Sequence, residues 1–364
     1  MRKVAQYIVL CATLCLSLLS CNIHEWPENP IPSVEVDLTL TFKTDMPELI
    51  RVDRASQFST TSADDYDVRY IVKAYPLAKD GTPIQNEVAG ESWSKDNVNN
   101  LDEQKTILLP PGKFRLYVWV DYVDNGSLED KFYTTNSDKG FSMISLVMPQ
   151  EKTSPANNHY RDLFIGEIDI EVPAMYELGL PHVKADIEMT RPLAMFQFIT
   201  TDLDEFVMKV LEQRAQEAAA RGVVLPESEL LPSSVDLTEY KVSIVYNDFM
   251  PTAFDMFQKQ PNYAENGISF DSYITPLGNN EALLGFDYTF VLDNKTEEGT
   301  HPRFSVLLYD KDNVLVSAVK DIHVPLERSK YTTITDKFMT QQASGGVSIN
   351  PDFEDEHNII IGDE

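Results

Sequence analysis

The sequence predicts an all-β protein built from two tandem β-sandwiches. Apolar and polar residues alternate in several segments, among them Val34–Phe42 and Phe114–Tyr122, as expected for strands with one buried face. Clusters of proline, glycine and asparagine separate these segments, and helical spacing stands out in a single stretch, near residues 202–221. Many short strands divided by turn residues favour antiparallel sandwiches.

The first 21 residues have the layout of a bacterial lipoprotein signal. A basic start, Met1-Arg2-Lys3, precedes a mainly apolar run, and Leu18-Leu19-Ser20-Cys21 matches a lipobox. The apolar run is shorter than the roughly 20 residues that a membrane-spanning helix needs. We therefore expect a signal peptide over residues 1–20 and lipidation of Cys21, with an ordinary signal and an incidental cysteine as the alternative.

All three cysteines lie in this leader. Cleavage before Cys21 leaves no second thiol, which excludes disulfides, zinc thiolates and a cysteine nucleophile from the mature chain. The formal net charge of −28 opposes binding to nucleic acid. Residues 21–33 contain three prolines and no apolar periodicity, so they predict an extended tether between the lipid and the first folded residue, Val34.

The remaining strands are predicted from the same alternation. They are Val183–Met189, Tyr240–Tyr246, Phe286–Leu292 and Phe304–Leu308. Asp310-Lys311-Asp312-Asn313 predicts a hairpin turn into Val314–Val316. Prolines and a glycine interrupt the pattern before Val183, and they place a domain boundary near residue 180. We expect one sandwich over residues 34–180 and a second over 181–364.

The helical stretch has apolar residues at helical spacing between Leu203 and Leu211. Thr201 or Asp202 can cap its start, and Gly222 can end it. Its second half is mostly polar residues and alanine, which predicts a helix that leaves the body and faces water. A solvated crossover between strands is favoured over a partner-binding helix.

Motifs of catalysis are absent from the sequence. It contains no Gly-x-Ser-x-Gly, no His-Glu-x-x-His and no phosphate-binding loop, and its histidines are isolated from one another. We expect no catalytic residues, no cofactor and no metal. The acidic loop Asp121–Asp130 is the strongest metal candidate, but it lacks the ligand spacing of an EF-hand, so a solvated hairpin loop is favoured.

The tryptophans suggest glycan binding as an alternative function, because aromatic rings can stack on sugars. Trp26, Trp93 and Trp119 could serve a surface glycan-binding lipoprotein. Trp119 lies on the strand face opposite the alternating apolar residues Phe114–Tyr122, so it is either exposed or covered by other parts of the chain. Packing in the core or between domains is the favoured alternative.

Five short sequence segments, taken in chain order, resemble segments of known proteins. They are Cys21–Pro27, Val118–Asp124, Tyr160–Phe164, Arg191–Ala194 and Lys337–Thr340 with Gly345–Ile349 after it. Together they resemble the fimbrillin-like lipoproteins of Bacteroidetes, closest to the FimB-type anchor or minor-subunit branch. The resemblance implies two transthyretin-like sandwiches in an outer-membrane lipoprotein of a fimbrial system. Glu25 and Glu28 near the lipid resemble surface-export signals and favour the cell surface, with the periplasmic face of the outer membrane as the alternative.

The resemblance also implies partners and sites. Fimbrial subunits of this type polymerise when a protease removes the first strand after an arginine and the terminal strand of a neighbour fills the groove, which is β-strand addition. Here the first strand is Val34–Phe42, and the candidate cleavage residues are Arg51 and Arg54; two surface loop residues are the alternative. Asn358, Ile359, Ile360 and Ile361, after His357, are either a donor strand or the last edge strand of the second sandwich.

These observations lead to one expected function. The protein is expected to be a lipid-anchored fimbrial anchor or accessory subunit that binds outer-membrane lipid through Cys21 and other subunits through strands. A surface glycan-binding lipoprotein is the alternative.

Overall fold

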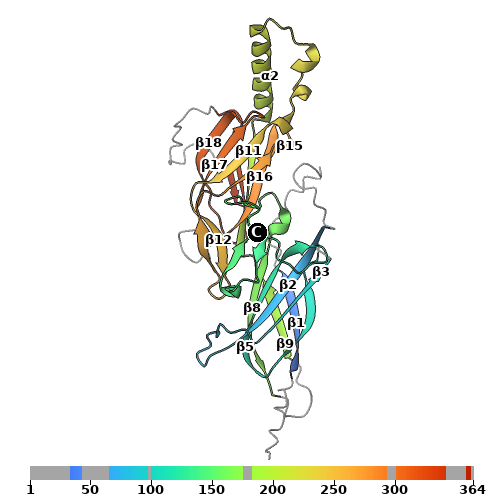
Figure 1. The fold of residues 1–364 in the computed structure, drawn as a ribbon, viewed down its shortest axis with the longest axis vertical. Coiled ribbons are helices and arrows are strands. Elements are labelled where there is room, and N and C mark those ends of the chain that lie inside the picture. The colour runs from blue at the N-terminus through green and yellow to red at the C-terminus, as the bar shows by residue number, and fades with distance from the viewer. Residues whose placement is uncertain are drawn as a thin grey trace, which may run out of the picture.

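The computed structural model describes residues 33–42, 65–96, 100–174, 183–292 and 301–341, together with the backbone of residues 358–361. In this part of the chain, two β-sandwiches lie end to end along the long axis, and the one α-helix, α2, projects beyond the second of them (Figure 1). The all-β architecture predicted from the alternating pattern is confirmed.

The first sandwich packs a three-stranded sheet on a four-stranded sheet. In the smaller sheet, β1 lies at the centre, antiparallel to β4 and parallel to β9. In the larger sheet, β2 and β5 are central, between β3 and β8. The strands are β1 (Val34–Phe42), β2 (Tyr66–Pro76), β3 (Ala89–Lys95), β4 (Glu103–Leu109), β5 (Gly112–Asp124), β8 (Phe164–Val172) and β9 (Val183–Met189).

The second sandwich consists of the five-stranded sheet β15-β16-β10-β19-β20 and the four-stranded sheet β14-β11-β17-β18. The predicted turn at Asp310–Asn313 joins β17 to β18, and Asn313 has a positive φ of 58°. The strands are β10 (Leu193–Thr200), β11 (Lys241–Tyr246), β14 (Ser269–Tyr273), β15 (Thr275–Gly278), β16 (Glu281–Phe290), β17 (Arg303–Tyr309), β18 (Leu315–His323), β19 (Tyr331–Asp336) and β20 (Asn358–Ile361).

The two sandwiches share one topology. If the strands of each are numbered one to seven in chain order, leaving out β15 and β20 as additions at the sheet edges, both read 4-1-7 in one sheet and 3-2-5-6 in the other. The first strand pairs in parallel with the seventh in each case, β1 with β9 and β10 with β19. The molecule is therefore a repeat of one seven-stranded unit with different insertions.

Strand pairing differs from the expected domain boundary near residue 180. β9 lies after that boundary, yet it completes the sheet of β1, from Val36 opposite Val183 to Phe42 opposite Met189. The first sandwich therefore extends to Met189, and β10 follows almost at once. Local composition marked the proline- and glycine-containing segment before β9 but could not show which sheet β9 would join.

A fifth sheet, β13-β12-β7-β6, joins the two halves. β6 and β7 are inserted between the fifth and sixth strands of the first sandwich, whereas β12 and β13 are inserted between the second and third strands of the second. The elements of this junction are β6 (Tyr133–Thr134), η2 (Gly140–Ser142), β7 (Ile144–Leu146), η3 (His159–Arg161), β12 (Met250–Asp255) and β13 (Gln260–Glu265). Insertions from both repeats thus pack together at the middle of the molecule (Figure 1).

The junction covers the outer face of the larger sheet of the first sandwich. Trp119 of β5 is fully buried there and packs edge to face on Tyr133 of β6, with ring centroids 5.5 Å apart. β5 is consequently buried on both faces over most of its length. The predicted alternation of its inner face is correct, and the opposite face is covered as well because the inserted elements fold over it.

One buried ion pair connects the junction to the second sandwich. Arg161 of η3 donates to Asp287 of β16, and both side chains are at most 1% exposed. The same carboxylate accepts hydrogen bonds from Ser154 (2.6 Å) and Tyr246 (2.9 Å), while Tyr133 donates to the carbonyl of Arg161 (2.6 Å). Burial raises the pKa of Tyr246, so its phenol stays protonated and able to donate. Asp287 is therefore fully compensated although it lies in the core.

Helix α2 (Leu203–Ala220) confirms the predicted helix, its end and the N-cap position of Asp202, but not a capping bond from that side chain. Asp202 occupies the N-cap position without capping through its side chain, which instead accepts from the backbone N–H of Thr340 (2.8 Å) and Met339. The free N–H groups of Leu203 and Asp204 bind Asn280, in the turn before β16. A distant turn supplies the cap because it folds next to the helix start.

The chain returns from α2 to β11 through three short 3-10 turns, η4 (Glu227–Leu230), η5 (Pro232–Ser234) and η6 (Leu237–Glu239).

The Asp287 pair makes a stability prediction. Asp287→Asn leaves the charge of Arg161 buried without its counter-ion, which costs about 3–5 kcal/mol of unfolding free energy. Urea denaturation followed by circular dichroism measures the loss. Asp169→Asn is the matched control, because Asp169 pairs with Arg115 at the surface and its loss costs at most about 1 kcal/mol. Equal losses for the two variants would contradict the role given to Asp287.

The placement of β1 makes a second prediction. Leu38 is 1% exposed at the centre of β1, so Leu38→Asp buries an unpaired charge and should destabilise the first sandwich by several kcal/mol. Thr41→Asp, on the exposed face of the same strand, should leave the melting temperature nearly unchanged. An unchanged melting temperature for Leu38→Asp would refute this placement of the strand.

Candidate functional site

The position of β1 between β4 and β9, which we call the β1 slot, is the best-formed candidate site for strand exchange. β1 forms seven residue pairs with each neighbour. Its inward side chains, Val34, Val36, Leu38, Leu40 and Phe42, are all at most 8% exposed. Backbone hydrogen bonds on both edges and alternating apolar pockets below are the two features by which an added strand is recognised.

β1 is held strongly in this slot. Fully burying one aliphatic or aromatic side chain stabilises by about 1.5–3 kcal/mol, and β1 buries five in addition to its two hydrogen-bonded ladders. Departure of β1 from the intact chain is therefore very unfavourable. An incoming strand could enter only after the chain is cut beyond Phe42 and only by replacing the same contacts.

The end of β1 packs against two of the sequence segments that carry the fimbrillin-like resemblance. Phe42 packs edge to face on Phe164, with centroids 5.0 Å apart, and the guanidinium of Arg191 lies 4.5 Å from the centre of the same ring. Arg191 in turn donates to Asp162 (2.8 Å) in a nearly buried ion pair. Tyr160–Phe164 and Arg191–Ala194 therefore meet where the first sandwich leads into the second.

A third of the sequence segments that carry the resemblance also holds parts of the fold together. Lys337–Thr340 follows β19, and the N–H groups of Met339 and Thr340 bind the buried carboxylate of Asp202. Lys337 also pairs with Glu205 on α2 (2.8 Å). This segment thus ties the last described stretch before β20 to the start of α2.

The candidate donor strand forms the outer edge of the second sandwich. The backbone of β20 pairs antiparallel with β19, from Thr332 opposite Ile361 to Thr335 opposite Asn358. It has one neighbouring strand and four residue pairs, whereas β1 has two neighbours. Within a single chain, the edge strand of this sheet therefore consists of Asn358, Ile359, Ile360 and Ile361.

Three other predicted site residues, Cys21, Arg51 and Arg54, lie outside the described residues. Arg51 and Arg54 fall in the connection between β1 and β2, and Cys21 precedes β1 by the tether. Across the described part of the chain, none of the helices has the length and apolarity to cross a bilayer.

The aromatic residues proposed for sugar stacking are packed. Trp119 is buried, as described above, which confirms the packing interpretation for that residue. Trp93 stacks on Tyr70 with centroids 5.3 Å apart, and the ammonium of Lys105 lies 5.2 Å from the centre of its indole. Trp26 lies outside the described residues. Trp119 has no exposed ring, and the ring of Trp93, which is partly buried, already contacts Tyr70 and Lys105.

The acidic loop Asp121–Asp130 is organised by an arginine. Arg69 is 1% exposed; it binds both carboxylate oxygens of Asp121 (2.8 and 2.6 Å) and donates to Asp130 (2.9 Å) and the carbonyl of Leu128 (2.8 Å). The guanidinium occupies the place where the loop could have gathered oxygen ligands around a cation. The loop is largely solvated, as predicted, with Asp124–Gly126, Leu128 and Glu129 exposed. It is not a hairpin, because it leads into β6, which pairs with β7 and not with β5.

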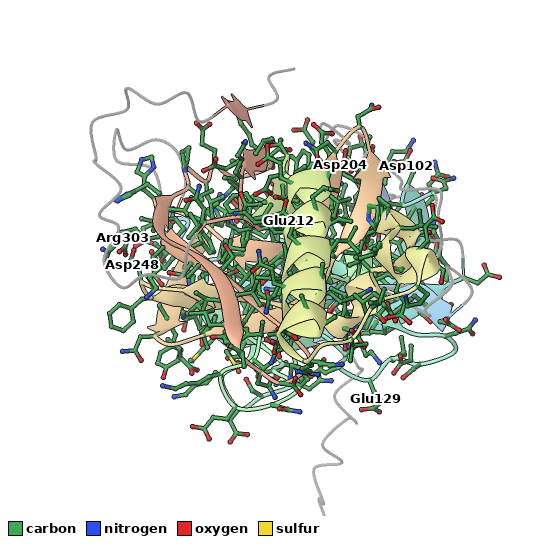
Figure 2. The ribbon with its side chains drawn as sticks, turned by 90° about the horizontal axis from the view of Figure 1, so that it is seen from above. Asp102, Glu129, Asp204, Glu212, Asp248 and Arg303 are labelled. Atoms are coloured by element: carbon green, nitrogen blue, oxygen red, sulfur yellow. The ribbon has the colours of Figure 1, made fainter. Side chains whose placement is uncertain are left out.

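Several titratable groups elsewhere in the described ranges form ion pairs or packing contacts. No group of three His, Cys, Asp or Glu residues there could hold a metal ion. Asp248 and Arg303 lie side by side at one edge of the molecule (Figure 2), and hydrogen bonds from Arg303 lower the pKa of Asp248. His159 stacks on Phe286 with centroids 4.4 Å apart, which is a packing contact.

Sequence reasoning missed the polar core of the junction, namely Arg161, Asp287 and Ser154. One signal was present: Asp287 interrupts a run that is otherwise apolar and aromatic, Phe286-Asp287-Tyr288. In a strand with one exposed face this aspartate would face water, so the pattern alone indicated nothing unusual.

Comparisons with known proteins add the following. Among solved structures, the chain is similar to a candidate polysaccharide-binding protein from Bacteroides thetaiotaomicron, with 12% identity, a TM-score of 0.43, and coverage of 83% of this chain and 90% of the other. It is also similar to a candidate adhesin from Bacteroides ovatus, with 14% identity, a TM-score of 0.44, and coverage of 84% and 89%. A third is the fimbrial anchor protein Mfa2 from Porphyromonas gingivalis, with 10% identity, a TM-score of 0.40, and coverage of 83% and 90%.

Likeness at this level does not by itself indicate a shared function. A search of curated protein sequences finds no significant match. Residues 30–362, which include both sandwiches and β20, match a single protein family over their whole length. The chain therefore belongs to DUF6562, a family of unknown function.

Proposed function

We propose that this protein is a lipid-anchored subunit at the bacterial cell surface that serves as an anchor or accessory subunit of fimbriae and joins its neighbours by β-strand complementation. Acyl chains on Cys21 would hold it at the outer membrane, since two or more chains anchor a protein stably. Residues 21–33 would give it reach, and the body begins at β1, directly after this tether.

One observation carries the proposal: the chain has both a deep strand slot and a terminal strand at an open sheet edge. β1 fills a slot with two hydrogen-bonded sides in the first sandwich, and β20 lies on one side of β19 in the second. Each net hydrogen bond stabilises by only about 0.5–1.5 kcal/mol, so the single four-pair ladder holds the backbone of β20 less strongly than two seven-pair ladders hold that of β1.

This difference indicates how the protein would act in a fibre. With β1 retained, the first sandwich is closed, and β20 is the strand through which the chain would join a neighbour by complementation. A closed first sandwich at the lipid end and an exchangeable strand at the other repeat suit a base subunit. Cleavage after Arg51 or Arg54 would instead open the slot and make the protein a shaft subunit.

Lipidation is tested by fractionation. Cys21→Ala removes the acylated thiol, so the protein should move from the membrane fraction to the soluble fraction. Cys15→Ala, inside the expected signal peptide, is the matched control and should remain in the membrane fraction. Retention of the Cys21→Ala protein in the membrane would rule out lipidation at this residue.

Strand complementation is tested by truncation. Deletion of residues 358–364 removes β20, and fibres detected by immunogold electron microscopy of intact cells should be lost or detached. Deletion of residues 362–364 alone keeps β20 and should leave the fibres unchanged. Normal fibre number and attachment after the longer deletion would exclude a donor role for β20, whereas gold spread evenly over cells without fibres would argue against a fimbrial function altogether.

A further inference from the structure

The far end of the α2 excursion carries four aliphatic side chains that the protein leaves in water. We call Val223, Val224, Leu230 and Leu231 the apolar tip. Val224 is 93% exposed, Val223 53%, Leu231 48% and Leu230 42%. Surface apolar residues scattered singly are ordinary, but four within nine positions at one turn of the chain are typical of an interaction site. Covering such side chains is favourable because it removes apolar surface from water.

The first half of the tip is held in a fixed shape by the end of α2. Gly222 has a positive φ of 69°, its N–H donates to the carbonyl of Ala219 (3.0 Å), and the N–H of Val223 donates to the carbonyl of Ala218 (2.9 Å). These two bonds form the Schellman motif, in which glycine is favoured because it has no Cβ. Val223 and Val224 therefore leave the helix in a defined direction.

The second half is held by Arg214. Its Nη1 donates to the side chain of Ser234 (3.1 Å) and to the carbonyl of Glu229 (3.2 Å), across from the middle of α2. Ser234 in turn donates to the carbonyl of Leu231 (2.7 Å). The two leucines are thus presented on a backbone that is already ordered, and a preorganised surface loses less entropy when it binds.

The acidic residues around the apolar tip indicate what kind of partner surface would bind it. Residues 203–239 contain eight Asp and Glu residues against three Lys and Arg, and Glu227 and Glu229 beside the tip are exposed. Glu212 projects from α2 itself (Figure 2). A second copy of this chain is acidic as well, with a formal charge of −28, and an anionic lipid surface has the same sign. Both are repelled, whereas a cationic protein surface is attracted.

The position of the apolar tip in the molecule also suits contact with a separate protein. The spur formed by α2 and η4–η6 lies at the opposite end of the long axis from the first sandwich, whose strand β1 follows the tether (Figure 1). Four hydrogen-bonded or paired contacts at its base, including Lys337 with Glu205 and Lys209 with the carbonyl of Thr340, tie the spur to the body. The tip is therefore carried on a firmly attached arm.

From these features we propose that the apolar tip docks into an apolar pocket bordered by lysine and arginine on a separate protein. The aliphatic side chains supply the buried contact, and Glu227 and Glu229 supply the charge-complementary border that selects the partner. This proposal does not depend on lipidation or on strand exchange, because no residue of the tether, the β1 slot or β20 takes part.

The test uses the full chain on intact cells. A benzophenone amino acid replaces Val224, and irradiation should link it to one protein that mass spectrometry identifies and whose docking surface is basic. The same photoprobe at Val314, an exposed valine in the turn between β17 and β18, is the matched control and should give at most a tenth of that adduct. Glu227→Lys with Glu229→Lys should lower the Val224 adduct at least tenfold, while Glu129→Lys, on a distant exposed loop, should not.

The identified protein is then titrated with the purified chain. Leu231→Asp should weaken binding at least tenfold and Val314→Asp should not, and added salt should weaken binding because part of the attraction is electrostatic. No adduct at Val224, an adduct only with lipid or with a second copy, equal yield at Val314, or insensitivity to the charge reversal would each overturn the proposal. All these substitutions are at exposed positions, and unchanged thermal melting verifies that the variants fold.

Discussion

The arrangement of the whole molecule depends on the buried pair of Arg161 and Asp287. Asp287 lies in the middle of β16 with no access to water, where an unpaired carboxylate would be strongly destabilising. It is compensated only when the segment from Ser154 to Arg161, inserted in the first repeat, lies against the second. Because the carboxylate needs Arg161, Ser154 and Tyr246 together, it permits one relative position of the two sandwiches.

This constraint gives the protein its end-to-end form. The two repeats have the same strand order, so the seven-stranded unit alone does not distinguish them. What distinguishes them is the insertions: β6, β7 and η3 in the first, and β12, β13 and the α2 spur in the second. Two of these insertions build the junction, and the third extends away from it. The features that set this protein apart from a simple tandem sandwich therefore lie outside the repeated core.

The candidate sites also differ in whether they belong to the repeated seven-stranded unit. The β1 slot belongs to the repeated unit, and β20 is an addition at the sheet edge of the second unit; β1 has two neighbouring strands and β20 has one. The apolar tip belongs to an insertion, and its shape follows from local hydrogen bonds at Gly222 and Arg214. β20 and the apolar tip are separate parts of the chain, and a surface tip can bind without any strand moving. The two proposed interactions can therefore operate at once.

The sequence by itself determined the features that depend on near neighbours. Alternation predicted β1 with its bounds, turn residues predicted the hairpin at Asp310–Asn313, and Gly222 predicted the end of α2. Tertiary structure alone decided the features that join distant residues. It placed β9 beside β1, buried Trp119 beneath β6, brought Asn280 to the start of α2 and paired Arg161 with Asp287. Periodicity along a strand shows which face is apolar, but it carries no information about which strand or inserted segment will cover that face, because the ladder hydrogen bonds of all strands are chemically alike.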